Sequence, residues 1–160
     1  MLTLKGNALE WANSCGYLGV TIVAARQFKC SFDSAKKSLY RSFNAIYGKI
    51  GSNASEEVVL QLIHAKCLPM LLYGLDACPV NVADSRSLEF TFTRLLMKVF
   101  KTSNMGVIND SRTAFCVDKI ANLIAKRKMN FLSRYAITDS ELVRTFANVA
   151  LKHRNSLIMV

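Results

Sequence analysis

The sequence has few residues that break secondary structure and few that carry negative charge. Of its 160 residues only seven are Gly and two are Pro. This composition excludes a collagen-like protein or a flexible linker, and a hydrophobic content of 51% is enough for a packed core. Eleven acidic residues stand against 21 Lys and Arg, which leaves a formal net charge of +10. Such an excess favours a polyanionic partner, nucleic acid or an anionic membrane, without identifying the fold.

Long apolar runs and a secretory cysteine pattern are also absent. The longest markedly apolar stretch, residues 67–75, contains Pro69 and is far shorter than the roughly 20 residues of a bilayer-spanning helix. The five cysteines are odd in number and widely spaced, and Lys5 and Glu10 interrupt any N-terminal apolar leader. We therefore expect an intracellular protein, nuclear or cytoplasmic, with no membrane partner.

The motifs that identify most enzyme sites are missing as well. There is no P-loop, no dinucleotide-binding fingerprint and no helical pair of histidines for zinc. The carboxylates are isolated or stand at expected helix starts, where acidic residues favour the helix dipole. His64, Cys67 and Cys78 are zinc-binding residue types, but one helical turn beside a proline is poor support for a tetrahedral site. The sequence therefore predicts no catalytic residue and no bound metal in this chain.

The first 25 residues have the period of two that is typical of strands. The runs 2–5 and 8–11 flank Gly6–Asn7, a pair of residues that suits the turn of a β-hairpin. The run 17–23 is rich in β-branched and aromatic residues and predicts a third strand. Gly19 inside this run indicates either a bulge or a place where another backbone comes close.

From Ser31 onward the apolar period changes to about 3.6 residues, the period of an α-helix. Apolar stripes and capping residues predict five helices, and Pro69 is expected to kink or end the second. Their expected ranges are about 31–50, 55–69, 84–101, 117–137 and 139–152. Residues 102–112 lack the period and are predicted to form a loop. The expected fold is mainly α, a short N-terminal β-hairpin and strand followed by a bundle of about five helices.

The positive charge gathers in two segments, residues 26–49 and residues 119–154. In the first segment Lys37 and Arg41 lie four residues apart, so they share a helical face next to a second row of polar side chains. Basic side chains among tyrosine and asparagine suit contacts with nucleic-acid phosphates and bases, although a solvated basic surface explains the same pattern. The candidate nucleic-acid-binding residues are Lys36, Lys37, Tyr40, Arg41, Asn44 and Lys49.

Several short motifs follow one another in order along about residues 9–102. They read Cys15-Gly16-Tyr17-Leu18-Gly19-Val20, Phe28-Lys29-Cys30-Ser31-Phe32-Asp33, Tyr40-Arg41-x-Phe43-Asn44-Ala45-Ile46-x-Gly48-Lys49-Ile50-Gly51, Lys66-Cys67-Leu68-Pro69-x-Leu71-Leu72-Tyr73-Gly74-Leu75-Asp76 and Leu96-Met97-Lys98-Val99-Phe100-Lys101-Thr102. In this order they resemble the region downstream of the catalytic motifs in LINE-type (non-LTR) retrotransposon reverse transcriptases. A weaker likeness extends to about residue 137.

The resemblance implies three regions. Residues 1–25 would form the end of the polymerase palm, residues 26–102 a thumb-like helical region, and residues 103–160 a helical C-terminal extension. Tyr17, Leu18 and Gly19 would belong to a primer-grip-like element near the primer terminus. The family's metal-binding aspartates lie upstream of the matched region, so we expect a fragment that is not an enzyme on its own.

The same resemblance implies the partners. The parent polymerase would need Mg²⁺, but no cofactor is expected in this chain. An RNA/DNA template-primer duplex would bind the thumb, and the missing palm and fingers of the parent polymerase would complete the enzyme. Two alternatives remain open at this point: a helical protein–protein interaction module whose charge keeps it dissolved, or a non-functional remnant of a mobile element.

Overall fold

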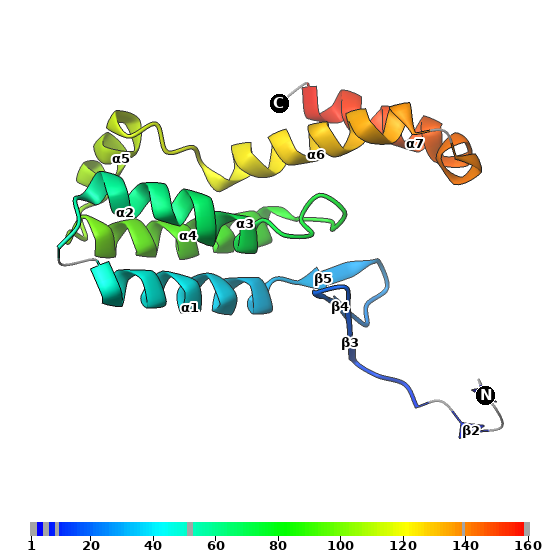
Figure 1. Ribbon diagram of the computed structural model, residues 1–160. Helices are drawn as coiled ribbons and strands as arrows, with labels where there is room; N and C mark the ends of the chain where they lie inside the picture. Colours follow the sequence, from blue (N-terminus) through cyan, green and yellow to red (C-terminus); the bar gives the residue numbers. More distant parts are fainter. Residues whose placement is uncertain (1–2, 5–6, 9, 51–52, 139, 159–160) are drawn as a thin grey trace.

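The computed structural model is mainly helical, with a three-stranded antiparallel sheet ahead of the helices, which confirms the expected fold class (Figure 1). The structure describes residues 3–4, 7–8, 10–50, 53–138 and 140–158. The strands are β1 Thr3–Leu4, β2 Asn7–Ala8, β3 Ser14–Tyr17, β4 Val20–Val23 and β5 Lys29–Ser31. The helices are α1 Asp33–Ile50, α2 Glu56–Leu62, the π-helical turn η1 Ile63–Cys67, α3 Leu68–Leu71, α4 Val82–Val99, α5 Met105–Ala114, α6 Ile120–Ile137 and α7 Glu141–Ile158.

The N-terminal hairpin is present, but its turn differs from the predicted one. β1 and β2 pair antiparallel, with Thr3 opposite Ala8 and Leu4 opposite Asn7. Asn7 is therefore a strand residue, and the expected Gly6–Asn7 turn is wrong in its second position. Gly6 itself lies outside the described residues.

The prediction of a single strand over residues 17–23 is wrong. Tyr17 at the end of β3 pairs with Val20 at the start of β4, so Leu18 and Gly19 form a two-residue hairpin turn. Both turn residues have positive φ, +46° and +78°, as the favoured type I′ hairpin turn requires. A leucine rarely adopts this conformation, and this is why β propensity alone hid the turn.

The first long helix begins two residues later than predicted. Ser31 ends β5, which pairs with β4, and α1 starts at Asp33. The Ser31 hydroxyl still accepts a hydrogen bond from the Asp33 amide at 3.4 Å, so a residue of β5 stabilises the first turn of α1. A strand of three residues is too short to show a period in the sequence, and β5 was therefore missed.

Pro69 does not break the second helical segment, because the chain widens into a π-helical turn ahead of it. Ser55 caps α2 by accepting from the Val58 amide, and α2, η1 and α3 follow one another without interruption. In η1 the Leu68 amide donates to the Ile63 carbonyl, five residues back. This wider turn lies immediately before Pro69, whose ring clashes with the carbonyl four residues back in a regular α-helix.

Most of residues 102–112, the predicted loop, belong to α5. The Asn104 side chain caps this helix by accepting from the Gly106 amide at 2.8 Å. Only Ile108 and Arg112 are buried in it, and Arg112 forms an ion pair with Glu89 of α4. Because an ion pair and a cap replace the usual apolar stripe, the sequence shows no helical period here.

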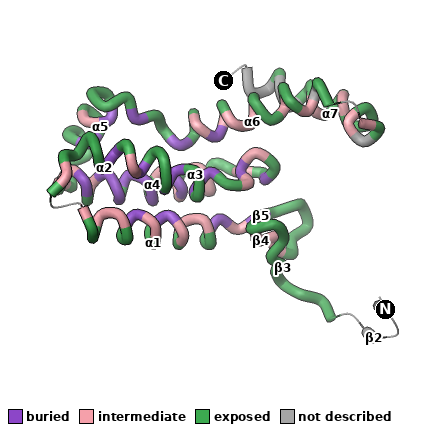
Figure 2. Tube along the Cα trace, viewed as in Figure 1, coloured by how far each residue is buried: buried purple, intermediate pink, exposed green. Residues whose placement is uncertain are grey.

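Helix α4 is the centre of the helical layers. It contacts α1, α2, α5 and α6, and one continuous core runs from α1 to the first half of α6 (Figures 1 and 2). α6 begins at Ile120 rather than near 117, and α7 extends beyond the predicted end at 152 to Ile158 and packs against α6. None of the described helices combines the length and the apolar character that a membrane-spanning helix needs.

Candidate nucleic-acid interface

A shallow groove lies between α1 and α4, which run in the same direction. At one end of the pair the Lys36 ammonium donates to the Ser87 hydroxyl at 3.0 Å, and at the other the Lys98 ammonium donates to the Asn44 side-chain oxygen at 3.1 Å. The Tyr47 hydroxyl donates to the Lys98 carbonyl at 3.2 Å. These bonds fix the spacing of the two helices and therefore the width of the groove.

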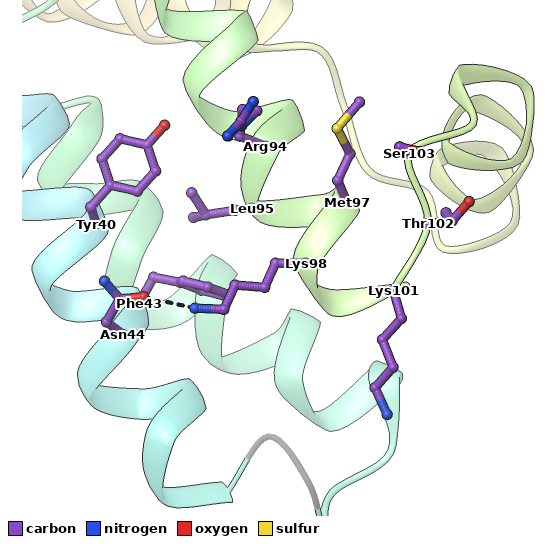
Figure 3. A pocket seen from close by; sticks show the side chains of 10 residues that line it. All are labelled: Tyr40, Phe43, Asn44, Arg94, Leu95, Met97, Lys98, Lys101, Thr102 and Ser103. Carbon is purple, nitrogen blue, oxygen red and sulfur yellow. Dashed lines mark hydrogen bonds between the residues drawn. The ribbon is translucent and has the colours of Figure 1, made fainter.

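The groove has a volume of about 560 Å³ and mixes aromatic, polar and basic side chains (Figure 3). Its lining comprises Tyr40, Phe43, Asn44, Arg94, Leu95, Met97, Lys98, Lys101, Thr102 and Ser103. No carboxylate stands among these lining residues. The groove therefore has a positive potential that acidic neighbours in its wall do not cancel.

Three of the lining residues form the α4 basic row: Arg94, Lys98 and Lys101. Arg94 and Lys98 lie four residues apart and share one face of α4, and Lys101 follows two residues beyond the end of that helix at Val99. Within the part of the chain that the structure describes, none of the three forms an ion pair. Unpaired cations in a row are free to contact the phosphates of an extended polyanion.

Lys98 is held in place by contacts that involve no acidic side chain. Its ammonium lies 5.5 Å from the centre of the Phe43 ring and 5.3 Å from that of Tyr47, besides its hydrogen bond to Asn44. The two rings are stacked at 5.2 Å and offer their faces to the cation. The remaining N–H groups of Lys98 are available to an anionic ligand because Asn44 takes only one.

Lys101 occupies a backbone conformation that favours glycine. It follows the C-terminal end of α4 with φ +51°, and the Thr102 amide beyond it donates to the Met97 carbonyl at 3.1 Å. This is the hydrogen bond of a Schellman-type helix end, in which glycine usually holds the left-handed position. A lysine there retains backbone strain, and strained residues cluster at functional positions.

The structure separates the six predicted α1 residues into four groups. Tyr40 and Asn44 line the groove, and Lys37 and Arg41 are exposed on the neighbouring face of α1. Lys49 lies about 120° around the helix from Lys37 and so points away from this side. Lys36 is only partly exposed and is engaged by Asp33 and Ser87.

Lys36 has a structural partner on its own helix. Its ammonium donates to the Asp33 carboxylate at 3.0 Å, and this hydrogen bond, together with the lysine charge, lowers the pKa of Asp33. The Ser31 hydroxyl, which donates to the same carboxylate, acts in the same direction. The charge of Lys36 is therefore largely compensated, whereas the charges of the α4 basic row are not.

The primer-grip-like residues form the tip of the β3–β4 hairpin, at the N-terminal end of α1 and apart from the groove (Figure 1). Their backbone docks on the segment after α3: the Tyr73 hydroxyl donates to the Leu18 carbonyl at 3.1 Å. A Cβ on Gly19 would lie 3.0 Å from the Tyr73 ring, so the close neighbour of this glycine is a side chain and not the predicted backbone. The structure does not bring this tip together with the basic groove.

The His, Cys, Asp and Glu side chains of the described residues do not assemble into a metal site. Over the described ranges no group of three or more His, Cys, Asp or Glu side chains is placed to hold a metal ion. Cys67 and Cys78 are buried, and burial raises the pKa of both thiols, that of Cys78 to about 12 with a further contribution from Cys30. His64 lines a different depression between α2 and the end of α5.

Sequence reasoning did not identify Arg94, Lys98 and Lys101 as part of a site. The four-residue spacing of Arg94 and Lys98, which puts them on one helix face, was the available signal. Comparisons with protein-family models, with curated proteins and with solved structures found no match. The function is therefore inferred from the chemistry of the groove and of the basic side chains around it.

Proposed function

We propose that this chain binds the backbone of an RNA/DNA template-primer duplex, as the thumb-containing part of a LINE-type reverse transcriptase. One observation carries the proposal. Five basic side chains occupy the α1–α4 surface, and none has an ion-pair partner among the described residues. They are Lys37, Arg41, Arg94, Lys98 and Lys101.

The chemistry of such a surface matches the task of a polymerase thumb. Phosphate contacts position a duplex without reading its sequence, and they require cations rather than catalytic groups. Electrostatic attraction to the closely spaced phosphates supplies most of the affinity of a protein of this kind. The motifs along residues 9–102 add the resemblance to the polymerase family, in which the catalytic aspartates belong to the upstream palm.

Charge reversal on α1 tests the proposal. The double variant Lys37→Glu/Arg41→Glu places two negative charges beside the groove, so binding of a blunt RNA/DNA hybrid in fluorescence anisotropy should fall at least tenfold. A matched control, Lys66→Glu/Lys126→Glu, changes the net charge equally at exposed positions away from the groove and should bind nearly as the unmodified chain does. An equal loss in both variants would show that net charge alone drives binding.

A polymerase assay tests the second part of the proposal. Purified chain should incorporate no nucleotide on a primed template, because two-metal chemistry needs paired carboxylates that the proposal assigns to the upstream palm. Nucleotide incorporation that co-purifies with the protein would contradict this assignment.

The relation to a LINE-type polymerase can be checked in the genome. We expect an in-frame or frameshifted Ala-Asp-Asp motif, which carries the family's metal-binding aspartates, in the sequence upstream of Met1.

A protein-binding function is the second candidate, and the α6–α7 hairpin favours it. Ile137 at the end of α6 is 84% exposed and Phe146 on α7 is 53% exposed, and Val149 is exposed on the same helix. Apolar side chains exposed together are typical of interaction sites. The charge reversal at Lys37 and Arg41 separates the two functions, since it should weaken hybrid binding at least tenfold and leave an interaction through α7 intact.

A further inference from the structure

The groove between α1 and α4 is large enough to take more than a phosphate group. Its volume of about 560 Å³ falls within the range of about 300–1,000 Å³ that is usual for small-molecule and cofactor sites. Leu95 and Phe43 close the bottom of the groove and are almost fully buried, Tyr40 keeps a partly exposed ring, and Asn44, Thr102 and Ser103 offer hydrogen-bonding groups. A partly exposed aromatic ring with a few polar groups near it suits a flat, polar ring better than it suits a bare anion.

Tyr40 and Arg94 form one end of the groove. They extend from α1 and α4 respectively, and Figure 3 shows them on opposite walls, with Leu95 between them. Tyr40 is 37% exposed, so part of its ring faces the groove while the rest packs on the protein. Tyrosine rings and guanidinium planes are the side-chain groups on which unpaired bases stack.

The cations lie where the phosphates of a strand passing the groove would need them. Lys98 crosses the groove from α4 towards Asn44, and Lys101 stands at the end away from Tyr40 (Figure 3). A strand that places one base beside Tyr40 thus passes Lys98 on α4 and then Lys101 just beyond the end of that helix. No part of this lining supplies a negative charge to oppose the strand.

A base-paired duplex cannot use this groove fully. Its bases are stacked and paired, so it presents phosphates and sugars to the protein and leaves the Tyr40 ring without a base to stack on it. An unpaired base can be splayed out and stacked on an aromatic side chain. We propose that the groove binds one unpaired nucleotide of a nucleic-acid strand, with its base beside Tyr40 and its flanking phosphates on Lys98 and Lys101. This inference rests on the proposed function, because it places the unpaired nucleotide next to a bound duplex.

The test compares two probes on the full chain. One is a blunt RNA/DNA hybrid, and the other is the same hybrid with an unpaired extension of three nucleotides. The extended hybrid should bind roughly tenfold more tightly in anisotropy titrations, as a stacked base contributes an effect of this order. Tyr40→Leu should remove this preference, so that the variant binds the extended and the blunt hybrid with the same affinity.

Controls keep the outcomes distinct. Phe28→Leu makes a similar change at an exposed aromatic side chain outside the groove and should retain the full preference. Lys101→Gln is a second groove variant that should reduce the preference without touching the packed ring of Tyr40, and circular dichroism melting checks that each variant folds. Equal affinity for the two probes would overturn the inference and leave duplex binding standing. If the unmodified chain bound neither hybrid, the proposed function itself would be overturned.

A competition experiment identifies the source of the nucleotide. Free adenosine monophosphate has the base and one phosphate but lacks the neighbouring phosphates of a strand. It should displace the extended hybrid only at concentrations at least a hundredfold above those of an unlabelled single-stranded trinucleotide. Displacement by the mononucleotide at equal concentration would overturn the assignment to a strand and point to a free nucleotide instead.

Discussion

Lysine side chains have three different roles in this chain, although the sequence presents them alike. Lys36 connects α1 to α4 through Ser87 and neutralises Asp33. Lys98 is positioned by Asn44 and two aromatic rings with its charge uncompensated. Lys101 ends a helix in a left-handed conformation. The partner of each ammonium decides its role, and in two of these three residues the partner lies more than 50 positions away in the sequence.

Replacement of Lys101 separates stability from binding. Lys101→Gly should raise the free energy of unfolding by about 0.5–1 kcal/mol, because glycine adopts positive φ without a Cβ penalty. The same variant should weaken hybrid binding, since it removes one cation of the α4 basic row. Urea denaturation and anisotropy measure the two effects.

Lys101→Gln is the matched control for that experiment. It removes the charge but keeps a side chain in the strained position, so hybrid binding should fall without any gain in stability. Both expectations rest on a strained Lys101 whose charge is needed for binding. They would be contradicted by a Lys101→Gly variant that is less stable than the unmodified chain, or by one that binds hybrid as tightly.

The cysteines should differ sharply in reactivity. Cys15 and Cys116 are exposed, whereas Cys30, Cys67 and Cys78 are buried. Thiolates are the reactive species, and burial raises the pKa of Cys67 and of Cys78, the latter to about 12. Treatment of the native chain with N-ethylmaleimide near pH 7.5 should therefore modify Cys15 and Cys116 alone, as read by peptide mass spectrometry.

The same pKa predicts a loss of stability at high pH. In the unfolded chain the Cys78 thiol ionises near its ordinary pKa of 9.0, whereas in the folded chain it stays protonated up to about pH 12. Its contribution to stability is therefore constant below about pH 9 and declines as the pH rises from 9 towards 12. Native modification of Cys78 at neutral pH would contradict both expectations.

Among the elements, the docking of the β3–β4 hairpin on the segment after α3 depends on one glycine. Gly74 has φ +72°, and a Cβ there would lie 2.6 Å from the Cγ2 atom of Val20 in β4. Gly74→Ala should therefore destabilise the fold by about 2 kcal/mol, from the strained conformation and the overlap together. Urea denaturation measures the change, and limited proteolysis within residues 10–31 shows whether the sheet has come loose.

Gly16→Ala is the matched control for the docking experiment. Gly16 lies in β3 without a positive φ, and a Cβ added to it would have no atom within 4 Å. The substitution should therefore change stability by less than about 0.5 kcal/mol. Equal destabilisation by the two substitutions would show that the sheet is sensitive to any alanine and that the contact between Gly74 and Val20 is unimportant.

Elements with a strong apolar stripe could be predicted from the sequence, and elements fixed by single contacts could not. α1 and α4 bury Leu39 and Phe43, and Leu88 and Phe92, at helical spacing, and both helices were predicted within two residues at each end. α5 depends on the Asn104 cap and on Arg112 and was missed. The turn at residues 18–19 depends on its docking against Tyr73, more than 50 residues away, and no local pattern indicates that contact.

At the scale of the whole molecule, the groove exists because α1 and α4 are brought together by the segment between them. The sequence placed Tyr40 and Asn44 beside each other on one helix, and the spacing of Arg94 and Lys98 puts these two on one face of another. It could not show that these two faces meet, since residue spacing fixes a face but not its neighbour. The interface was thus half predictable: its side chains were visible in the sequence, and their assembly was not.

The core has a further consequence for the whole chain. It continues from α1 through α4 to Val117, Ile120 and Ile124, so the helices on both sides of residue 102 share one apolar interior. Among the described helices, α7 makes extensive contacts with α6. The basic groove therefore rests on the shared core, whereas the α6–α7 hairpin extends from it (Figures 1 and 2).

The salt dependence of hybrid binding tests the proposed phosphate contacts most directly. If the five basic side chains of the α1–α4 surface each neutralise a phosphate, the affinity for a blunt RNA/DNA hybrid should fall with a log–log slope of roughly −4. Replacing the α4 basic row in Arg94→Gln/Lys98→Gln/Lys101→Gln should make the slope shallower by about 2 to 3. The control Lys66→Gln/Lys119→Gln/Lys126→Gln removes the same charge elsewhere and should keep the slope of the unmodified chain. An identical slope in the unmodified chain and in the α4 variant would contradict phosphate binding at this groove.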